Sequence, residues 1–295
     1  MGIYQALLNQ KGRPMLAIVT GASRGLGRRC ARHLAAAGAD LLLVARDSMA
    51  LAKVAAEVAG PGAQIQVSTL GCDLADPDAP EILHSAAERL GGADILINNA
   101  AIQGPIGRAW EVPWRDFEAA LRLDFLVPVQ LCRAVIPGMK AKNRGWIVNI
   151  SGGGGTGPRP MFTANGAAKT ALVRFSEALA IEAAPYGIRV NAVAPGAFAS
   201  DMTKAVSASE AEAGTAEVTA ARGLLDRGDE TNAETAARLV TYLTFGAGRE
   251  VTGKLISAVR DRWDTLHRNP AVLAHKDVFT LRRVVPEERN LSLDG

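Results

Sequence analysis

The 295-residue sequence has little of several features that define specialised proteins. Its three cysteines, Cys30, Cys72 and Cys132, are widely spaced and form no CxxC pair. This spacing argues against a disulfide framework or a cysteine-based metal site and is typical of a reducing compartment. No apolar run approaches the roughly 20 residues that a membrane-spanning helix needs, and the first residues lack the pattern of a secretory signal. We therefore expect a cytoplasmic protein with no metal and no membrane partner.

Charge of one sign and aromatic residues are also scarce. The formal net charge is only +3 and no basic block occurs, so nucleic acid is not an expected partner. Aromatic residues make up 5% of the chain, and the only tyrosines are Tyr4, Tyr186 and Tyr242. Hydrophobic residues reach 48%, which is enough for a large buried core. A globular protein with a small-molecule ligand fits this composition best.

Short aliphatic runs alternate with longer helix-like segments, a pattern typical of a parallel sheet covered on both faces. We therefore predict an α/β fold, a single Rossmann-type doubly wound parallel sheet of seven strands with helices on both faces. The predicted strands are Met15–Thr20, Asp40–Ala45, Gln64–Gly71, Ile95–Asn98, Gly145–Ile150, Arg189–Ala194 and Lys254–Val259. The predicted helices are 25–37, 48–59, 77–90, 114–139, 162–184 and 232–245.

The alternation fills one domain over residues 14–259, because no internal repeat or long linker divides it. Residues 1–13 form an N-terminal extension, and residues 260–295 a C-terminal one. Within the domain, residues 200–232 are rich in Ala, Glu and Thr but poor in large apolar groups. We predict that this segment is a mobile helical flap over a substrate.

A glycine-rich turn follows the first predicted strand and precedes a helix. Its glycines allow a tight turn and a close approach of the backbone to a pyrophosphate, and the helix N-terminus favours the phosphate charge. The strand before it and the helix after it make the motif more specific than a glycine triplet alone. The sequence therefore predicts a dinucleotide site, whose residues are Gly21, Ser23, Arg24, Gly25, Leu26 and Gly27.

Together with later landmarks, this turn resembles the short-chain dehydrogenase/reductase family over about residues 14–259. The landmarks are Cys72-Asp-Leu74, Asn98-Asn-Ala-Ala101, Pro195-Gly-Ala-Phe-Ala-Ser200 and the segment that ends in Lys169. The resemblance implies that Asp73 and Leu74 lie at the adenine and that Asn99 shapes the cleft floor. It also implies that Pro195, Gly196 and Ser200 hold the nicotinamide carboxamide.

The end of the second strand bears on the choice of cofactor. Members that use NAD usually have an acid there, which binds the ribose 2′-hydroxyl. This chain has Ala45 followed by Arg46, and Arg24 adds a second cation within the glycine turn. Two guanidinium groups can bind a 2′-phosphate through charge-assisted hydrogen bonds, so we predict NADP(H) over NAD(H). The simpler alternative is that Arg46 only solvates a loop.

The catalytic segment departs from the family pattern, which the resemblance gives as a serine, a tyrosine, a lysine and a helix asparagine. Lys169 is kept, but Asn165 occupies the tyrosine position one helical turn before it. Asp124 stands at the asparagine position, and Gly152 at the serine position, directly after Ser151. A hydride acceptor still needs a proton. We expect Lys169 to supply it, with Asp124 or His267 as alternatives.

The loop between Ser151 and Asn165 contains residues that indicate how a substrate is bound. Arg159 lies between two prolines and is interpreted either as a ligand for a phosphate or carboxylate, or as a solvated loop residue. Gly152 and Gly153 remove side chains from the expected cleft wall. Relatives commonly pair the helices at 114–139 and 162–184, so a homodimer or homotetramer is expected.

Three functions remain open at this point. The first is an NADP(H)-dependent oxidoreductase with an altered proton path, acting on a hydroxyl or carbonyl group. The second is non-redox chemistry on the same scaffold, such as epimerisation, elimination or cyclisation. The third is a catalytically silent NADP-binding protein.

Overall fold

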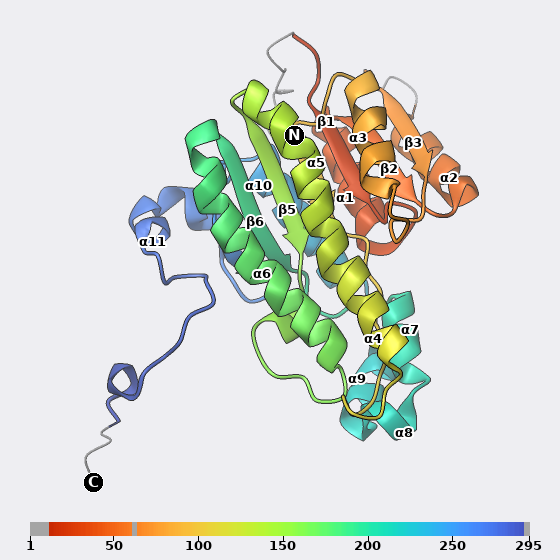
Figure 1. The fold of residues 1–295 in the computed structure, drawn as a ribbon, viewed down its shortest axis with the longest axis vertical. Coiled ribbons are helices and arrows are strands. Elements are labelled where there is room, and N and C mark those ends of the chain that lie inside the picture. The colour runs from red at the N-terminus through yellow and green to blue at the C-terminus, as the bar shows by residue number, and fades with distance from the viewer. Residues whose placement is uncertain (1–11, 61–63, 292–295) are drawn as a thin grey trace.

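A computed structural model describes residues 12–60 and 64–291 and contains one parallel sheet of seven strands, in the order β3-β2-β1-β4-β5-β6-β7 (Figure 1). The predicted fold class is confirmed. Most strands match their predicted ranges within one residue, but β3 begins at Val67 rather than Gln64, and β7 is only three residues long. The strands are β1 Leu16–Thr20, β2 Asp40–Ala45, β3 Val67–Gly71, β4 Ile95–Asn98, β5 Gly145–Ile150, β6 Ile188–Ala194 and β7 Leu255–Ser257.

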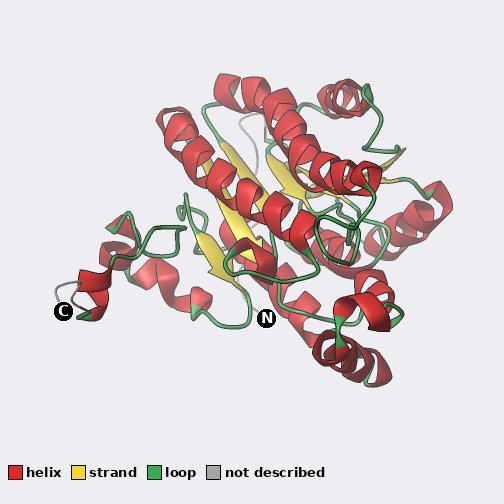
Figure 2. Cartoon of the chain, turned by 60° about the horizontal axis from the view of Figure 1, so that its bottom comes forward, coloured by secondary structure: helices red, strands yellow, loops and turns green. Residues whose placement is uncertain are grey.

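Two helical layers cover the sheet, as Figure 2 shows. One face carries α1 Gly25–Ala36, α2 Ser48–Val58 and α10 Thr231–Thr244. The other carries α3 Ala79–Arg89, α5 Val127–Ala141 and α6 Thr163–Ala183. Because both faces are covered, every residue of β1, β4 and β5 is buried, and most of these residues are apolar.

The chain order reverses between β1 and β4, which lie side by side in the sheet. In doubly wound sheets such a reversal opens a crevice at the carboxyl ends of the strands, where ligands bind. Thr20 at the end of β1 spans this point, since its hydroxyl donates to Ile97 O at 3.2 Å and accepts from Asn99 N at 2.9 Å. The fold therefore predicts a ligand site at the carboxyl edge of the sheet, between β1 and β4.

The predicted helix 114–139 is interrupted, which is a difference from the prediction. It consists of α4 Trp114–Leu121, a π-helical turn Arg122–Leu126, and α5. Pro128 explains the break, because a proline has no N–H to donate to the carbonyl of Asp124 four residues earlier, and its ring crowds that carbonyl. Val127 N instead donates to Arg122 O, five residues back. The wide turn places Asp124 in a buried position.

The segment predicted to form a flap contains the helices α7 Asp201–Ser207, α8 Glu210–Ala213 and α9 Thr215–Asp226. It lies beyond the carboxyl edge of the sheet, near α4 (Figure 1). A small separate core joins it to the body, in which the fully buried Phe162 packs with Val206 and Val218. Ala199 N donates to Asp229 O at 2.7 Å, so the segment leaves and re-enters the body at one point.

The C-terminal tail runs past the edge strand β7. Leu255 N donates to Phe279 O at 2.7 Å, and Lys254 Nζ donates to His275 O at 2.7 Å and to Val278 O at 2.9 Å. The tail contains α11 Pro270–Ala274 and reaches away from the body at its end (Figure 1). Within the described ranges, no helix is long and apolar enough to cross a membrane.

Candidate active site

The glycine turn after β1 has the geometry that close backbone packing requires. Gly21 and Gly25 have φ angles of +63° and +53°, a region that favours glycine. A Cβ on Gly27 would lie 2.2 Å from Gly21 O, so no larger residue fits there. The first N–H groups of α1 have no partner within the helix and can bind a phosphate. These features fit a dinucleotide.

Asn99 holds the glycine turn against the end of β4. Its Nδ2 donates to Thr20 O at 2.8 Å and to Gly21 O at 3.3 Å. A Cβ on Gly27 would also clash with this amide, at 2.6 Å. Asn99 therefore holds the backbone of the glycine turn in place at the carboxyl edge of the sheet.

The other predicted cofactor residues lie around the same carboxyl edge. Asp73 is exposed and accepts from Ala75 N at 3.0 Å, while Leu74 beside it is buried. Gly196 has a φ of +80°, which explains a glycine after the buried Pro195. In the glycine turn, Ser23 is half-buried and Leu26 is buried.

Ser200 caps α7, because its Oγ accepts from Thr203 N at 3.2 Å. The end of the predicted carboxamide loop is therefore also the start of the flap. This gives Ser200 a structural role that the sequence comparison with the family does not indicate.

The two predicted phosphate cations differ in their surroundings. Arg24 forms an ion pair with Asp201 at the start of α7, with Nη1 and Oδ2 2.6 Å apart. Arg46 is exposed, and in the part of the chain that the structure describes it has no ion-pair partner. Sequence reasoning missed Asp201, although its position directly after a helix-capping serine marks it as a first-turn acid.

Asp124, Asn165 and Lys169 form one cluster, as their sequence positions suggest. Lys169 Nζ lies 3.4 Å from Asp124 Oδ2 and donates to Ile150 O at 3.2 Å. Asn165 Nδ2 donates to the same Asp124 oxygen at 3.2 Å and to Ile102 O at 3.3 Å. The cluster thus joins the wide turn, helix α6 and the end of β5.

The carboxyl group of Asp124 is completely buried. Burial raises its pKa, while the Lys169 ammonium and the hydrogen bond from Ile102 N, at 2.9 Å, oppose the increase. A carboxyl group with a raised pKa next to an ammonium is typical of sites that move protons, although buried structural ion pairs show the same feature.

Ser151 does not face the crevice. Its buried Oγ lies 3.4 Å from Lys169 O and packs against Gly155. Adjacent residues on an extended chain point to opposite sides, and a Cβ on Gly152 would meet nothing within 4 Å. The open side is therefore at Gly152 and also at the exposed Gly153, whose Cβ would be equally free.

Arg159 is not a free loop cation. Its Nε and Nη2 bind the two carboxylate oxygens of Glu217 on α9, at 3.2 and 2.8 Å, and its guanidinium lies 3.7 Å from the centre of the Phe162 ring. Neither of the two readings made from sequence anticipated this ion pair between the loop and the flap. Its residues are 58 positions apart, so no local sequence signal identifies it.

His267 lies outside the cluster. Its Nδ1 is 3.1 Å from Tyr242 Oη near the end of α10, beside Trp263. Helices α1 and α10 run antiparallel to the strands, so their last turns lie toward the opposite edge of the sheet from the glycine turn. The structure does not bring His267 near Lys169, and Asp124 is the remaining alternative acid. Within the described ranges, no group of three His, Cys, Asp or Glu side chains could hold a metal ion.

Comparison with known proteins adds to this geometry. A family model described as short chain dehydrogenase matches residues 15–211. Human dehydrogenase/reductase SDR family member 4 is 33% identical over 182 residues, which are 61% of this chain and 65% of that protein. D-beta-hydroxybutyrate dehydrogenase from Cupriavidus necator is 30% identical over 245 residues, 81% of this chain and 94% of that protein.

Solved structures are similar over most of the chain. An NAD+-bound xylitol dehydrogenase superposes with a TM-score of 0.72 at 26% identity, covering 82% of this chain and 96% of the other. A metagenomic short-chain oxidoreductase in complex with NADP gives a TM-score of 0.66 at 28% identity, with coverages of 82% and 96%. The two structures carry different cofactors.

Proposed function

Because the chain belongs to the short-chain dehydrogenase/reductase family, we propose that it is an NADP(H)-dependent oxidoreductase with an altered proton path. It acts on a hydroxyl or carbonyl group of a polar small-molecule substrate. The contact between Lys169 Nζ and Asp124 Oδ2, 3.4 Å apart, carries this proposal. Lys169 provides an ionisable proton donor at the site where Asn165 stands in place of the tyrosine of typical family members.

The residues that hold the cofactor follow from the crevice. The backbone from Gly21 to Gly27 binds the pyrophosphate, and Arg46 binds the 2′-phosphate from its exposed position. Gly196 and Ser200 border the nicotinamide. The bound nicotinamide supplies or accepts a hydride.

Lys169 performs the proton transfer in this proposal. Reduction of a carbonyl leaves an alkoxide that must gain a proton. Two N–H bonds of Lys169 point at Ile150 O and Asp124, which leaves the third for the substrate oxygen. Asp124 holds the ammonium in place, and Asn165 holds Asp124. Oxidation of an alcohol uses the same groups in reverse, so that the hydroxyl proton passes to the neutral amine.

A catalytically silent NADP-binding protein is the second candidate, and one observation favours it. Both N–H bonds of the Asn165 amide are used within the protein, and Ser151 is turned inward. With Asp124 as a carboxylate, Lys169 is then the only one of the four predicted catalytic residues with a donor to spare. If Lys169 serves only to hold the cofactor ribose, the site binds the cofactor without turnover.

We also propose a homodimer or homotetramer through α5 and α6, as the family resemblance implies. Leu126 before α5 and Ile181 on α6 are exposed, at 45% and 78%. Apolar side chains in such positions are typical of an interface between subunits.

The test is the oxidation of NADPH, followed by the absorbance of the reduced nicotinamide, with a panel of polar ketones and aldehydes. Turnover that falls about 10²-fold or more in Lys169→Met supports the proposal, since that is the lower range for loss of an acid. Lys140→Met is the matched control, because Lys140 lies on α5 over the ring of Tyr186. NADPH binding without turnover across the panel favours the silent protein.

A further inference from the structure

The ion pair between Arg24 and Asp201 connects the two sides of the cofactor crevice. Arg24 directly precedes α1 in the glycine turn, and Asp201 begins α7 of the flap. Their side chains meet at 2.6 Å, while 72% of the Arg24 side chain and 46% of the Asp201 side chain stay exposed. A cation expected to bind the cofactor is therefore already bound to an acid of this chain.

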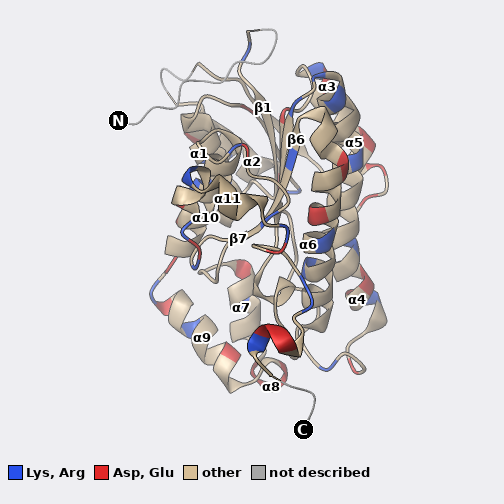
Figure 3. Cartoon of the chain, turned by 90° about the vertical axis from the view of Figure 1, so that its left-hand side faces the viewer, with Lys and Arg blue, Asp and Glu red and all other residues tan. Residues whose placement is uncertain are grey.

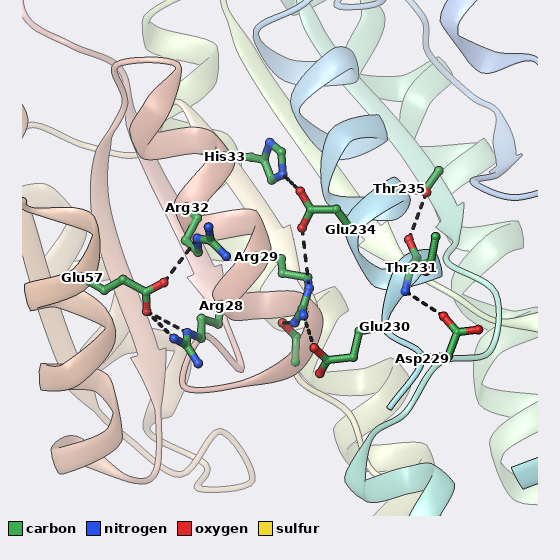
Figure 4. A network of polar contacts seen from close by, with 11 residues as sticks. Arg28, Arg29, Arg32, His33, Glu57, Asp229, Glu230, Thr231, Glu234 and Thr235 are labelled. Carbon is green, nitrogen blue, oxygen red and sulfur yellow. Dashed lines mark hydrogen bonds and ion pairs between the residues drawn. The ribbon is translucent and has the colours of Figure 1, made fainter. Parts of the chain in front are cut away.

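The other basic side chains of α1 also contact acids. Figure 4 shows Arg28 and Arg32 at Glu57 of α2, and Arg29 and His33 at the acids that begin α10. Figure 3 shows Lys and Arg positions as well as Asp and Glu positions on this side of the chain. Of the two cations expected at the 2′-phosphate, Arg46 has no ion-pair partner among the described residues, whereas Arg24 can bind the phosphate only by exchanging its partner.

Such an exchange requires little rearrangement. Asp201 has a second cation, Lys204, whose Nζ lies 3.1 Å from Oδ1. The carboxylate therefore stays paired when Arg24 leaves it. An exposed ion pair is weak, whereas a phosphate with nearly two negative charges is a stronger partner for a guanidinium.

We propose that Asp201 lowers the preference of this chain for NADP(H) by competing with the 2′-phosphate for Arg24. The inference rests on the proposed cofactor site. NADPH must displace the carboxylate to bind Arg24, and a carboxylate left nearby repels the phosphate. NADH carries a neutral hydroxyl at this position and binds with the ion pair intact. Asp201 is thus a specificity-determining residue that the family motifs do not include.

The experiment measures dissociation constants of NADPH and NADH by fluorescence titration, without substrate. Asp201→Asn should raise the affinity for NADPH about two- to fivefold, the range for one exposed ion pair. The affinity for NADH should change by less than about twofold. Glu210→Gln is the matched control, because it removes a flap carboxylate that binds Arg222 instead. Adding Arg24→Met to Asp201→Asn should abolish the gain.

Two results overturn the inference while the proposed function stands. One is an unchanged affinity for NADPH in Asp201→Asn, and the other is an equal gain for both cofactors. The same ratio shift in Glu210→Gln would overturn it as well, because the effect would then be one of general charge. Failure of the unmodified protein to bind either cofactor would instead refute the proposed function.

Discussion

Asp124 Oδ2 and Lys169 Nζ lie 3.4 Å apart, although neither side chain has more than a few per cent of its surface in solvent. The pair unites a turn widened by Pro128 with the first half of α6. Asn165 completes it by donating to the same carboxylate oxygen. In this arrangement Asn165 is a positioning residue for Asp124, which gives the replaced tyrosine position a defined contact.

Asp124→Asn tests this relationship through stability. At about pH 5 the substitution should lower the free energy of unfolding by about 1–3 kcal/mol, because the new amide places N–H groups against the donors of Lys169 and Asn165. Burial raises the pKa of Asp124 in the folded state. The folded protein then holds a proton that the unfolded chain releases, so the wild type loses stability as pH rises above the ordinary value of 3.8.

In urea unfolding curves the deficit of the Asn variant should therefore shrink as the pH rises above the ordinary value of 3.8 and through the raised pKa of the folded state. Asp116→Asn, an exposed acid on α4, is the control and should show no such trend. A stability deficit that grows with pH would contradict this, because it would mean that the Lys169 charge lowers the pKa of Asp124 more than burial raises it.

The open wall at Gly152 allows the usual catalytic groups to be rebuilt. Gly152→Ser should fold normally, since its Cβ meets nothing within 4 Å and the backbone there is extended. We expect Asn165→Tyr to raise ketone reduction about 10²-fold, and the double variant to exceed either single one. Steady-state rates with a simple ketone and NADPH measure this. Gly153→Ser, an equally open position, is the control. A double variant no faster than wild type would place the defect elsewhere.

Local sequence patterns predicted most of the fold for a physical reason. Strands such as Ile95–Asn98 are buried on both faces, so their residues are mostly apolar, with the polar Asn98 only at the carboxyl end. The glycine turn was equally predictable, because Gly21 and Gly27 are fixed by backbone geometry within a few residues. The prediction made strand β3 too long at its start. This strand lies at the edge of the sheet, where packing places weaker constraints on residue type.

Contacts between distant residues could not be predicted in the same way. The sequence placed Asn165, Lys169 and Asp124 at one site by family resemblance, but not the direction of their hydrogen bonds. Arg159 and Glu217 are far apart in the chain, and Arg24 meets Asp201 only when the flap folds back. A charged surface residue has many possible ion-pair partners in the sequence, and only the tertiary structure determines which of them lies close enough to pair.

The ion pair of Arg159 with Glu217 should hold the flap closed. Both Arg159→Gln and Glu217→Gln should speed hydrogen exchange of the α9 amides, and the double variant should add little. The pair is partly exposed, so we expect a coupling of only about 0.5–1 kcal/mol. Arg222→Gln breaks a pair within the flap and is the control. Additive effects of the two substitutions would show that the contact does not stabilise the closed flap.

The same pair predicts a pH dependence. The hydrogen bond from Arg159 is the main cause that lowers the pKa of Glu217 in the folded state. Its stabilisation is present above the ordinary value of 4.5 and is lost as pH falls through the folded pKa. After correction for the intrinsic pH dependence of amide exchange, the protection of the α9 amides should therefore fall below about pH 4.5 in the wild type but not in Glu217→Gln. A parallel response of both proteins would assign the effect to other carboxylates.

Lys254 should control whether the tail stays on the edge of the sheet. Its ammonium donates to two tail carbonyls, and hydrogen bonds to charged groups contribute about 1.5–3 kcal/mol. Lys254→Met should therefore release residues 275–281 and expose Phe279 to chymotrypsin. Lys53→Met, on the exposed side of α2, should leave the cleavage rate unchanged.

Burial lowers the pKa of Lys254, so the ammonium is harder to maintain in the folded state than in the unfolded chain. Loss of the proton therefore favours the folded state, so the wild-type tail should become no easier to cleave as the pH rises toward the ordinary value of 10.5, while Lys254→Met should show the same rapid cleavage at every pH. Equal cleavage of wild type and variant at neutral pH would mean that Leu255 and Phe279 hold the tail without Lys254.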